Sequence, residues 1–324
     1  IKYRTIRSGR DDGSVYLAGT YNFDNGIEFS ADLHYWESEA DNVYYPYFVQ
    51  QSYDAGYIIN NAGEILGAFG EDYTGGSIDP NVWDSYGYAY GFGQRFFAEK
   101  NWQSDYEEDT LSYTMALAGN FEFRESIWDW EVAYVYDDYY YLQGAEDVMN
   151  DSLAAWSCGG VIDHYPELCS EGSYGYSVFN PDTWWGTYET AASYGLWRYN
   201  YIEGDSSSET LQFTMSGDLF NMPAGPVGFA LHIEDTTTEY EIDPGPEFDA
   251  DNVWGNSTTE GGGERTRSSY AVEFAVPLSA KLNLFLASRR DDYDEKSTQI
   301  GGKDTDQVTF TWKPTDNLLI RGGW

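Results

Sequence analysis

Hydrophobic and polar residues alternate along much of the chain. In residues 27–36 apolar side chains take every second position from Ile27, and polar ones take the others from Glu28. Residues 111–123 repeat this pattern, with Leu111, Tyr113 and Met115 on one side. Further alternating runs cover 128–137, 211–219, 227–233, 270–278 and 308–312. Strict alternation predicts β-strands with one apolar and one polar face.

Short and long connections alternate between these runs. The short ones are rich in Gly, Pro, Asn and Asp, as hairpin turns are; they cover 22–26, 124–126, 221–226, 280–281 and 314–317. The long ones cover 37–109, 144–205 and 241–264, with a shorter one near 295–302. Tight turns at one end and long loops at the other are typical of transmembrane β-barrels. We expect ten or eleven strands and no helix with a convincing period.

A soluble β-sandwich would alternate in the same way. Three features favour the barrel: the long runs, the long loops at a single end, and aromatic residues near strand ends, such as Tyr35, Trp36 and Trp128. The predicted fold is therefore all-β, an antiparallel transmembrane β-barrel meander with its apolar face toward lipid. Such a sheet must close, because lipid offers no partners to backbone groups. The abrupt ends at Ile1 and Trp324 favour half of a larger barrel over a closed ten-stranded one.

Composition narrows the possible partners. The chain has 324 residues with 55 acidic and 17 basic side chains, a net charge of −38. This charge excludes nucleic acid as a default partner, since phosphate binding needs a basic surface. The three long segments hold most of the excess negative charge. Aromatic residues make up 18% of the chain, which argues against disorder, and no apolar run approaches the length of a transmembrane helix.

The residues give no sign of catalysis. Neither G-x-S-x-G nor H-E-x-x-H occurs, and His34, His164 and His232 are scattered. Residues 249–252 begin like a calcium loop, but Val253 and Trp254 stand where a ligand and the turn glycine belong. We therefore expect no enzyme activity, no metal and no cofactor.

Several segments resemble large TonB-dependent receptors of the outer membrane. They are 217–230 (GDLFNMPAGPVGFA), 265–278 (RTRSSYAVEFAVPL), 286–293, 310–314 and 319–322, together with the pair Cys158 and Cys169 in a long loop. The resemblance is specific over 205–324 and rests on strand rhythm before that. It implies a 22-stranded barrel around a plug domain, of which residues 1–324 would be one part without plug, TonB box or final strands. The implied partners are outer-membrane lipid, the TonB complex acting through the plug, and a small nutrient.

The polar face carries charged residues that we expect to hydrogen-bond across the lumen or to the plug. They are Glu28, Asp32, Glu122, Glu131, Asp218, Glu234, Glu273, Arg289 and Arg321. Other carboxylates, such as Asp137 and Asp138, are interpreted as solvated charge.

Aromatic residues of the long segments are the candidate ligand-binding residues, because ring faces stack on apolar or sugar surfaces. They are Trp83, Trp102, Trp184, Trp185, Trp197 and Trp254, with Trp156 nearby. For any single one of them, packing between loops is the simpler role. Cys158 and Cys169 are expected to form a disulfide, worth about 3 kcal/mol for a loop this short; free thiols are the alternative.

The resulting functional hypothesis is a bacterial outer-membrane transporter that imports a scarce nutrient. An acidic vestibule disfavours anions, which points to an oligosaccharide or a peptide, with a siderophore still open. The alternatives are a passive porin-like barrel and a secreted β-sandwich that binds or hydrolyses carbohydrate.

Overall fold

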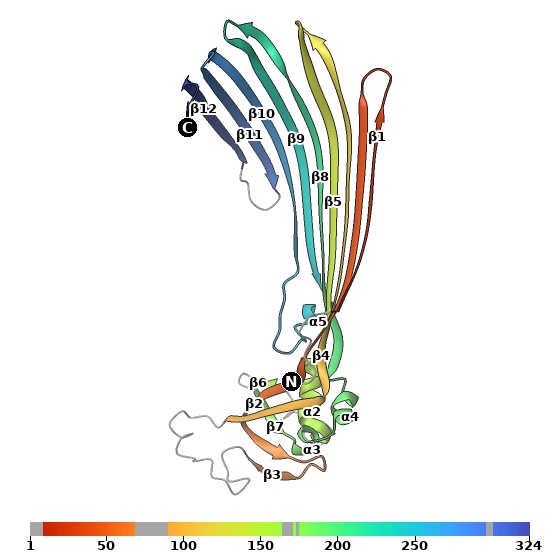
Figure 1. Cartoon of the computed structure of the whole chain (residues 1–324). Coiled ribbons are helices and arrows are strands. Elements are labelled where there is room, and N and C mark those ends of the chain that lie inside the picture. The colour runs from red at the N-terminus through yellow and green to blue at the C-terminus, as the bar shows by residue number, and fades with distance from the viewer. Residues whose placement is uncertain (1–8, 69–89, 164–170, 173–174, 296–300) are drawn as a thin grey trace.

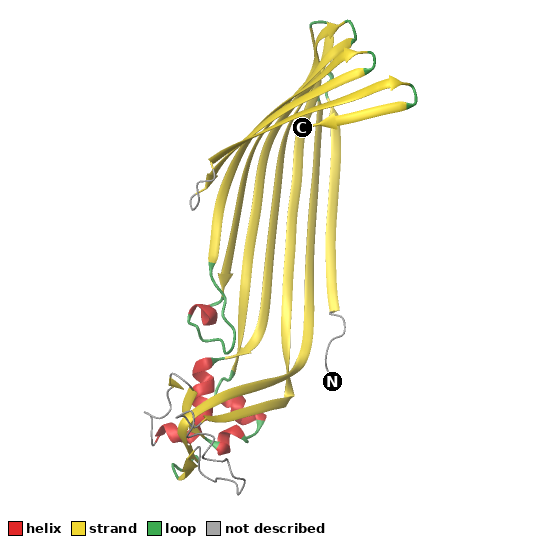
Figure 2. Cartoon of the chain, turned by 90° about the vertical axis from the view of Figure 1, so that its left-hand side faces the viewer, coloured by secondary structure: helices red, strands yellow, loops and turns green. Residues whose placement is uncertain are grey.

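The computed structural model describes residues 9–68, 90–163, 171–172, 175–295 and 301–324. Ten strands form an antiparallel meander in chain order (Figures 1 and 2). They are β1 (Gly9–Asn22), β2 (Glu28–Ile59), β4 (Tyr90–Phe123), β5 (Ser126–Val148), β8 (Trp197–Met222), β9 (Gly225–Pro244), β10 (Gly261–Ser279), β11 (Leu282–Glu295), β12 (Gly301–Thr315) and β13 (Leu318–Gly323). The predicted all-β meander is confirmed, and the chain forms one curved wall of a β-barrel.

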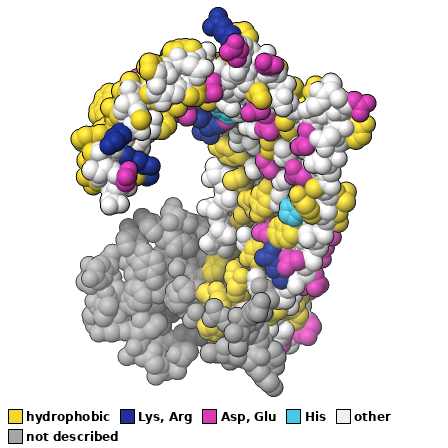
Figure 3. Space-filling model, turned by 45° about the horizontal axis from the view of Figure 1, so that its top comes forward, with side chains coloured by type: hydrophobic (Ala, Val, Ile, Leu, Met, Phe, Trp, Pro, Cys, Tyr) yellow, Lys and Arg dark blue, Asp and Glu magenta, His cyan; other side chains and the backbone are white. Residues whose placement is uncertain are grey.

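The register aligns the two kinds of side chain across the whole wall. Leu33 lies opposite Leu17 on β1 and opposite Tyr113 on β4. On the other face Glu131 lies opposite Thr214, which in turn lies opposite His232. Because successive residues of a strand point to opposite faces, this register makes one face apolar and the other polar. In the tilted view of Figure 3, the wall curves into an arc with many hydrophobic side chains along its outer margin at the upper left.

The short connections lie together at one end of the wall, as the sequence predicts (Figure 1). The hairpin between β4 and β5 turns on Arg124 and Glu125, with φ of 51° and 65°. Positive φ at both central residues is the geometry that matches the twist of two-residue hairpins. Gly26, with φ of 82°, serves the turn between β1 and β2.

The predicted long loops are wrong in their bounds. β2 and β4 run for 32 and 34 residues and include all of 37–59 and 90–109. β5 and β8, which are 23 and 26 residues long, likewise extend into 144–205. At about 3.3 Å per residue, the 34 residues of β4 have a length of about 110 Å along the strand. A strand needs only about 9–11 residues to cross a bilayer, so β4 is far longer than a bilayer requires. Backbone pairing continues where the apolar alternation stops, as at Glu39, which lies opposite Glu107.

The far ends of β2, β4, β5 and β8 enter a compact region that we call the distal cap (Figures 1 and 2). It contains β3 (Ile65–Ala68), β6 (Glu171–Gly172), β7 (Gly175–Phe179), α2 (Asn150–Cys158), the 3-10 helix η1 (Gly159–Asp163), α3 (Pro181–Trp184), α4 (Tyr188–Ser193) and, beside it, α5 (Pro246–Asp249). The sequence did not predict these helices, because four to nine residues are too few to show a helical period. Among the described residues, no helix is long and apolar enough to span a membrane.

β1 and β13 form the two edges of the meander. In the described part of the chain no ladder joins them, so the wall is open. This agrees with the expectation of an incomplete barrel.

Candidate ligand-binding surface and the inner wall

The distal cap has a hydrophobic core of its own. Trp156 and Trp184 are fully buried, with ring centroids 4.5 Å apart. Phe97 from β4 packs between Trp156 and Trp197, at 5.9 and 4.8 Å. Because these residues come from α2, α3, β4 and β8, the core joins segments that are far apart in the sequence. The cap is therefore a folded platform and not a set of independent loops.

Arg95 clamps one side of this core. Its two terminal nitrogens donate to the backbone carbonyls of Trp184 and Gly186, both at 2.6 Å. Its guanidinium also lies over the ring of Phe97, 4.8 Å from the centroid. Burial lowers the pKa of Arg95. This role could not be predicted from the sequence, because the partners of Arg95 are carbonyls on a distant segment.

A buried amide fastens the other side. Asn180 donates through Nδ2 to the carbonyl of Cys158 and to Oδ1 of Asn61, both at 2.7 Å. Asp182 accepts from the backbone N–H of Asn61 at 3.0 Å. Gly159 has φ of 54°, and a Cβ there would lie 2.7 Å from Nδ2 of Asn180. These contacts fix the turn after β2 against the cap helices.

The structure places the predicted tryptophans in different environments. Trp184 is fully buried, and Trp197 stacks on Tyr188 at 5.2 Å; both have packing roles in the core. Trp102 lies on β4 and not in a loop. Trp185 is 67% exposed, and Trp83 lies outside the described residues. Ligand binding by Trp184 would require the core to open, so we do not carry it forward as a ligand-binding residue.

Two predicted tryptophans belong to a row of linked aromatic rings on the cap. We call this row the aromatic ridge; its members are Tyr44, Tyr45, Phe48, Phe96, Trp102 and Trp254. Tyr44 stacks on Trp102 at 4.5 Å, and Tyr45 lies 6.2 Å from both Trp102 and Phe48. Phe48 continues the row to Phe96 at 5.8 Å and to Trp254 at 6.3 Å. Tyr45 and Phe96 are 50% and 63% exposed, so part of the ridge is open to solvent.

Each cation of the described cap already has partners. Arg95 is held by carbonyls, as above, and Lys100 forms an ion pair with Glu146. Arg198 pairs with Asp151 and, at 2.9 Å, with Glu247. These are the three basic residues among cap residues 42–68, 90–109, 139–163, 171–172, 175–203 and 244–262. The described cap therefore offers an incoming anion no unpaired positive charge.

Asp147 is a carboxylate of the cap whose ionisation is affected by burial. Burial raises its pKa, and the side chains of Asn200 and Trp102 partly oppose this effect. Tyr47, buried nearby, has a raised pKa, first through burial and then through the charges of Asp147 and Glu146. Burial therefore disfavours a negative charge on either of these two side chains inside the cap.

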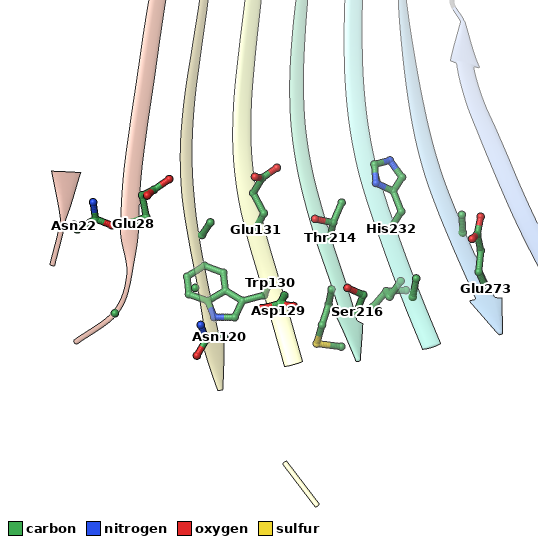
Figure 4. Close-up of a pocket in the computed structure, with 17 residues that line it drawn as sticks. Asn22, Glu28, Asn120, Asp129, Trp130, Glu131, Thr214, Ser216, His232 and Glu273 are labelled. Carbon is green, nitrogen blue, oxygen red and sulfur yellow. The ribbon is translucent and has the colours of Figure 1, made fainter. Parts of the chain in front are cut away.

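The polar face of the wall is hollowed toward the turn end. A cavity of about 700 Å³ lies there, and Figure 4 shows the side chains that line it, from β1, β2, β4, β5, β8, β9 and β10. Those that bear on its chemistry are Glu28, Asn120, Glu131, Thr214, His232 and Glu273. The cavity therefore carries several carboxylates, alongside apolar residues such as Trp130, Met215 and Leu231.

Charged residues of the polar face pair along the wall. Glu234 accepts from Arg267, and it lies 3.1 Å from Nε2 of His232. Arg289 donates to Asp291 and, at 3.0 Å, to the hydroxyl of Ser269. We expected Glu234 and Arg289 to bond across a lumen or to a plug, whereas their partners here lie on the same or neighbouring strands. These bonds join β9, β10 and β11.

The described residues contain no group of three or more His, Cys, Asp or Glu side chains placed to hold a metal ion. In the segment that begins like a calcium loop, Asn252 donates to Glu247 at 2.7 Å. Cys158 is disulfide-bonded; Cys169, its expected partner, lies outside the described residues.

Comparison with known proteins gives likeness in structure alone. No family model matches the sequence, and no curated protein is significantly similar to it. Two solved structures are similar over 98% of this chain at 11% identity. One is the FpvAI–pyocin S2 complex, with a TM-score of 0.50, and the other is the ferripyoverdine receptor of the outer membrane of Pseudomonas aeruginosa bound to ferripyoverdine, with a TM-score of 0.51. The chain covers 36% and 35% of those proteins, so it spans about a third of their length and shares the fold of part of their barrel.

Proposed function

We propose that this chain is part of the barrel of an outer-membrane receptor that imports a small nutrient with energy from the TonB complex, delivered through a plug domain. The observation that carries this proposal is the apolar face of the wall. Leu17, Met115, Leu117, Val132 and Leu211 all lie on it and are all exposed. A continuous exposed apolar surface that extends over several strands is unfavourable in water and favourable against acyl chains.

The length of the apolar band fits a bilayer. On β5 the apolar positions run from Trp128 to Tyr136, and Asp138 takes the next position on that face. On β4 the band ends at Leu111, and Asp109 follows on the same face. A band of about 9–11 residues per strand is what a transmembrane barrel needs. The remaining residues of each long strand would then carry the distal cap well outside the membrane.

The polar face would line the lumen. Its carboxylates, hydroxyls and ion pairs suit water or a polar plug and would be costly against lipid. Nothing in this arrangement calls for covalent chemistry by these residues, and binding followed by transport is the activity that it suits.

Surface labelling of the bacterium that makes the protein tests this proposal. Antibodies raised against the distal cap should label intact, unpermeabilised cells, and the protein should fractionate with the outer membrane. Recovery from the soluble fraction without detergent would contradict the proposal and favour a β-sandwich. Uptake that persists after deletion of TonB would instead indicate a passive pore.

A further inference from the structure

We propose that the aromatic ridge is a docking platform of this receptor and that its ligand is a neutral carbohydrate chain. The proposal rests on the proposed function, because it assumes that the cap meets solutes outside the cell. It adds the place of binding and the chemical class of the ligand.

The arrangement of the rings is the first reason. The rings form a chain of pairwise contacts that runs from Trp102 through Tyr45 and Phe48 to Phe96, with the spacings given above. A cation is best held over an aromatic face, and cages of rings converge on it; in the ridge, each ring is instead linked to the next. Rings in a row suit an extended ligand with repeated flat apolar faces, and sugar rings present such faces.

The ridge is also held firmly in place. Trp102 is stacked on Tyr44, and the backbone N–H of Trp254 donates to the carbonyl of Val148 at 2.8 Å. Trp102 and Trp254 both pack against the cap core. Because the platform is formed before binding, little conformational entropy is lost when a ligand settles on it.

Charge supplies the third reason. Arg95, Lys100 and Arg198 are all engaged within the protein, and carboxylates far outnumber bases in the cap segments. A carboxylate or phosphate on the ligand would meet repulsion and no free ion-pair partner among the described residues of the cap. Sugar hydroxyls, in contrast, can donate to carboxylate oxygens.

Binding of defined oligosaccharides to the complete protein in detergent tests the proposal. The probes are maltohexaose, cellohexaose and xylohexaose as neutral chains, hexagalacturonate as the anion and chitosan hexamer as the cation. Titration calorimetry measures the binding of each probe. The variants are Tyr45→Ala and Phe96→Ala, with Trp185→Ala as a matched control, since Trp185 is an exposed ring of the same cap outside the ridge. Melting curves establish that each variant is folded.

We expect at least one neutral hexamer to bind and hexagalacturonate not to bind. Each ridge variant should weaken binding by about tenfold, the loss of one stacking contact, and Trp185→Ala should leave affinity unchanged. The proposal is overturned if no neutral hexamer binds at millimolar concentration, if either charged hexamer binds more tightly, or if the ridge variants bind as the parent does. Surface labelling of cells would still succeed in those cases, so the ligand assignment can fail while the receptor assignment stands.

Discussion

Trp184 and Trp185 are adjacent residues of one type with opposite environments, and they give the sharpest test of the cap core. Trp184 is fully buried against Trp156, whereas Trp185 is 67% exposed. Replacing a buried Trp by Ala removes its transfer free energy and leaves a cavity, a cost of about 3–5 kcal/mol. The same change at Trp185 should alter stability by less than about 0.5 kcal/mol.

The loss in Trp184→Ala should be confined to the cap, because the wall is held by its own ladders. Hydrogen exchange followed by mass spectrometry measures this region by region. Amides of α2 and α3 should exchange about 100-fold faster or more, as such a loss of stability implies, while amides of β9–β11 keep the rate of the parent. Equal exchange in the two variants, or faster exchange across the whole wall, would refute a separate cap core built on Trp184.

Three further predictions follow from the same contacts. Burial raises the pKa of Asp147, so the ionised carboxylate destabilises the cap once pH rises through the folded pKa of Asp147. The substitution Asp147→Asn should therefore raise the melting temperature at pH 7 and have less effect near pH 4. An equal effect at both pH values would contradict this. Arg95→Ala leaves the carbonyls of Trp184 and Gly186 without their donor, which should lower the stability of the cap by about 1–3 kcal/mol for each carbonyl. In limited proteolysis the cap of this variant should be cut faster than that of the parent, and the cap of Arg95→Lys should be cut at an intermediate rate. Leu117→Arg on the apolar face should lower folding stability in bilayers by about 2–4 kcal/mol, whereas Asn120→Arg on the polar face should be tolerated. An equal loss of stability for the two variants in reconstituted vesicles would count against the assignment of the two faces.

The course of the wall could be predicted because alternation reports directly on which face a residue occupies. Leu111, Tyr113 and Met115 share one face, and their partners Tyr35, Leu33 and Ala31 continue it on the next strand. Turn chemistry fixed the hairpin ends for the same local reason. The contacts of Glu234 could be predicted only in part. The alternating pattern places Glu234 on the polar face, but its partner Arg267 lies on the neighbouring strand and depends on the register.

The far halves of the strands could not be predicted in the same way. Glu37 lies opposite Asp109, and Glu39 lies opposite Glu107. Like charges placed directly opposite each other oppose strand pairing, so an acidic stretch suggests a loop. Here the ladders continue to the cap, where buried contacts hold the ends of β2, β4, β5 and β8 together.

The candidate site was only partly visible in the sequence. Richness in aromatic residues pointed to the right segments, but it could not separate Trp184 in the core from Trp102 on the ridge. Phe96 was missed because it becomes part of the ridge only through its pairing with Phe48. Exposure of a ring is decided by contacts between distant segments, and alternation along one strand does not report on them.

Quenching of a fluorescent probe at two adjacent positions of β5 tests the central claim most directly. Val132 lies on the apolar face and Glu131 on the polar face. Each would be replaced in turn by cysteine, labelled and studied in lipid vesicles with a lipid-attached and an aqueous quencher. The account predicts that the Val132→Cys probe is quenched from the lipid and the Glu131→Cys probe from water. A Val132→Cys probe that neither quencher reaches would mean that the apolar face is sealed inside the protein, and the barrel wall would have to be given up.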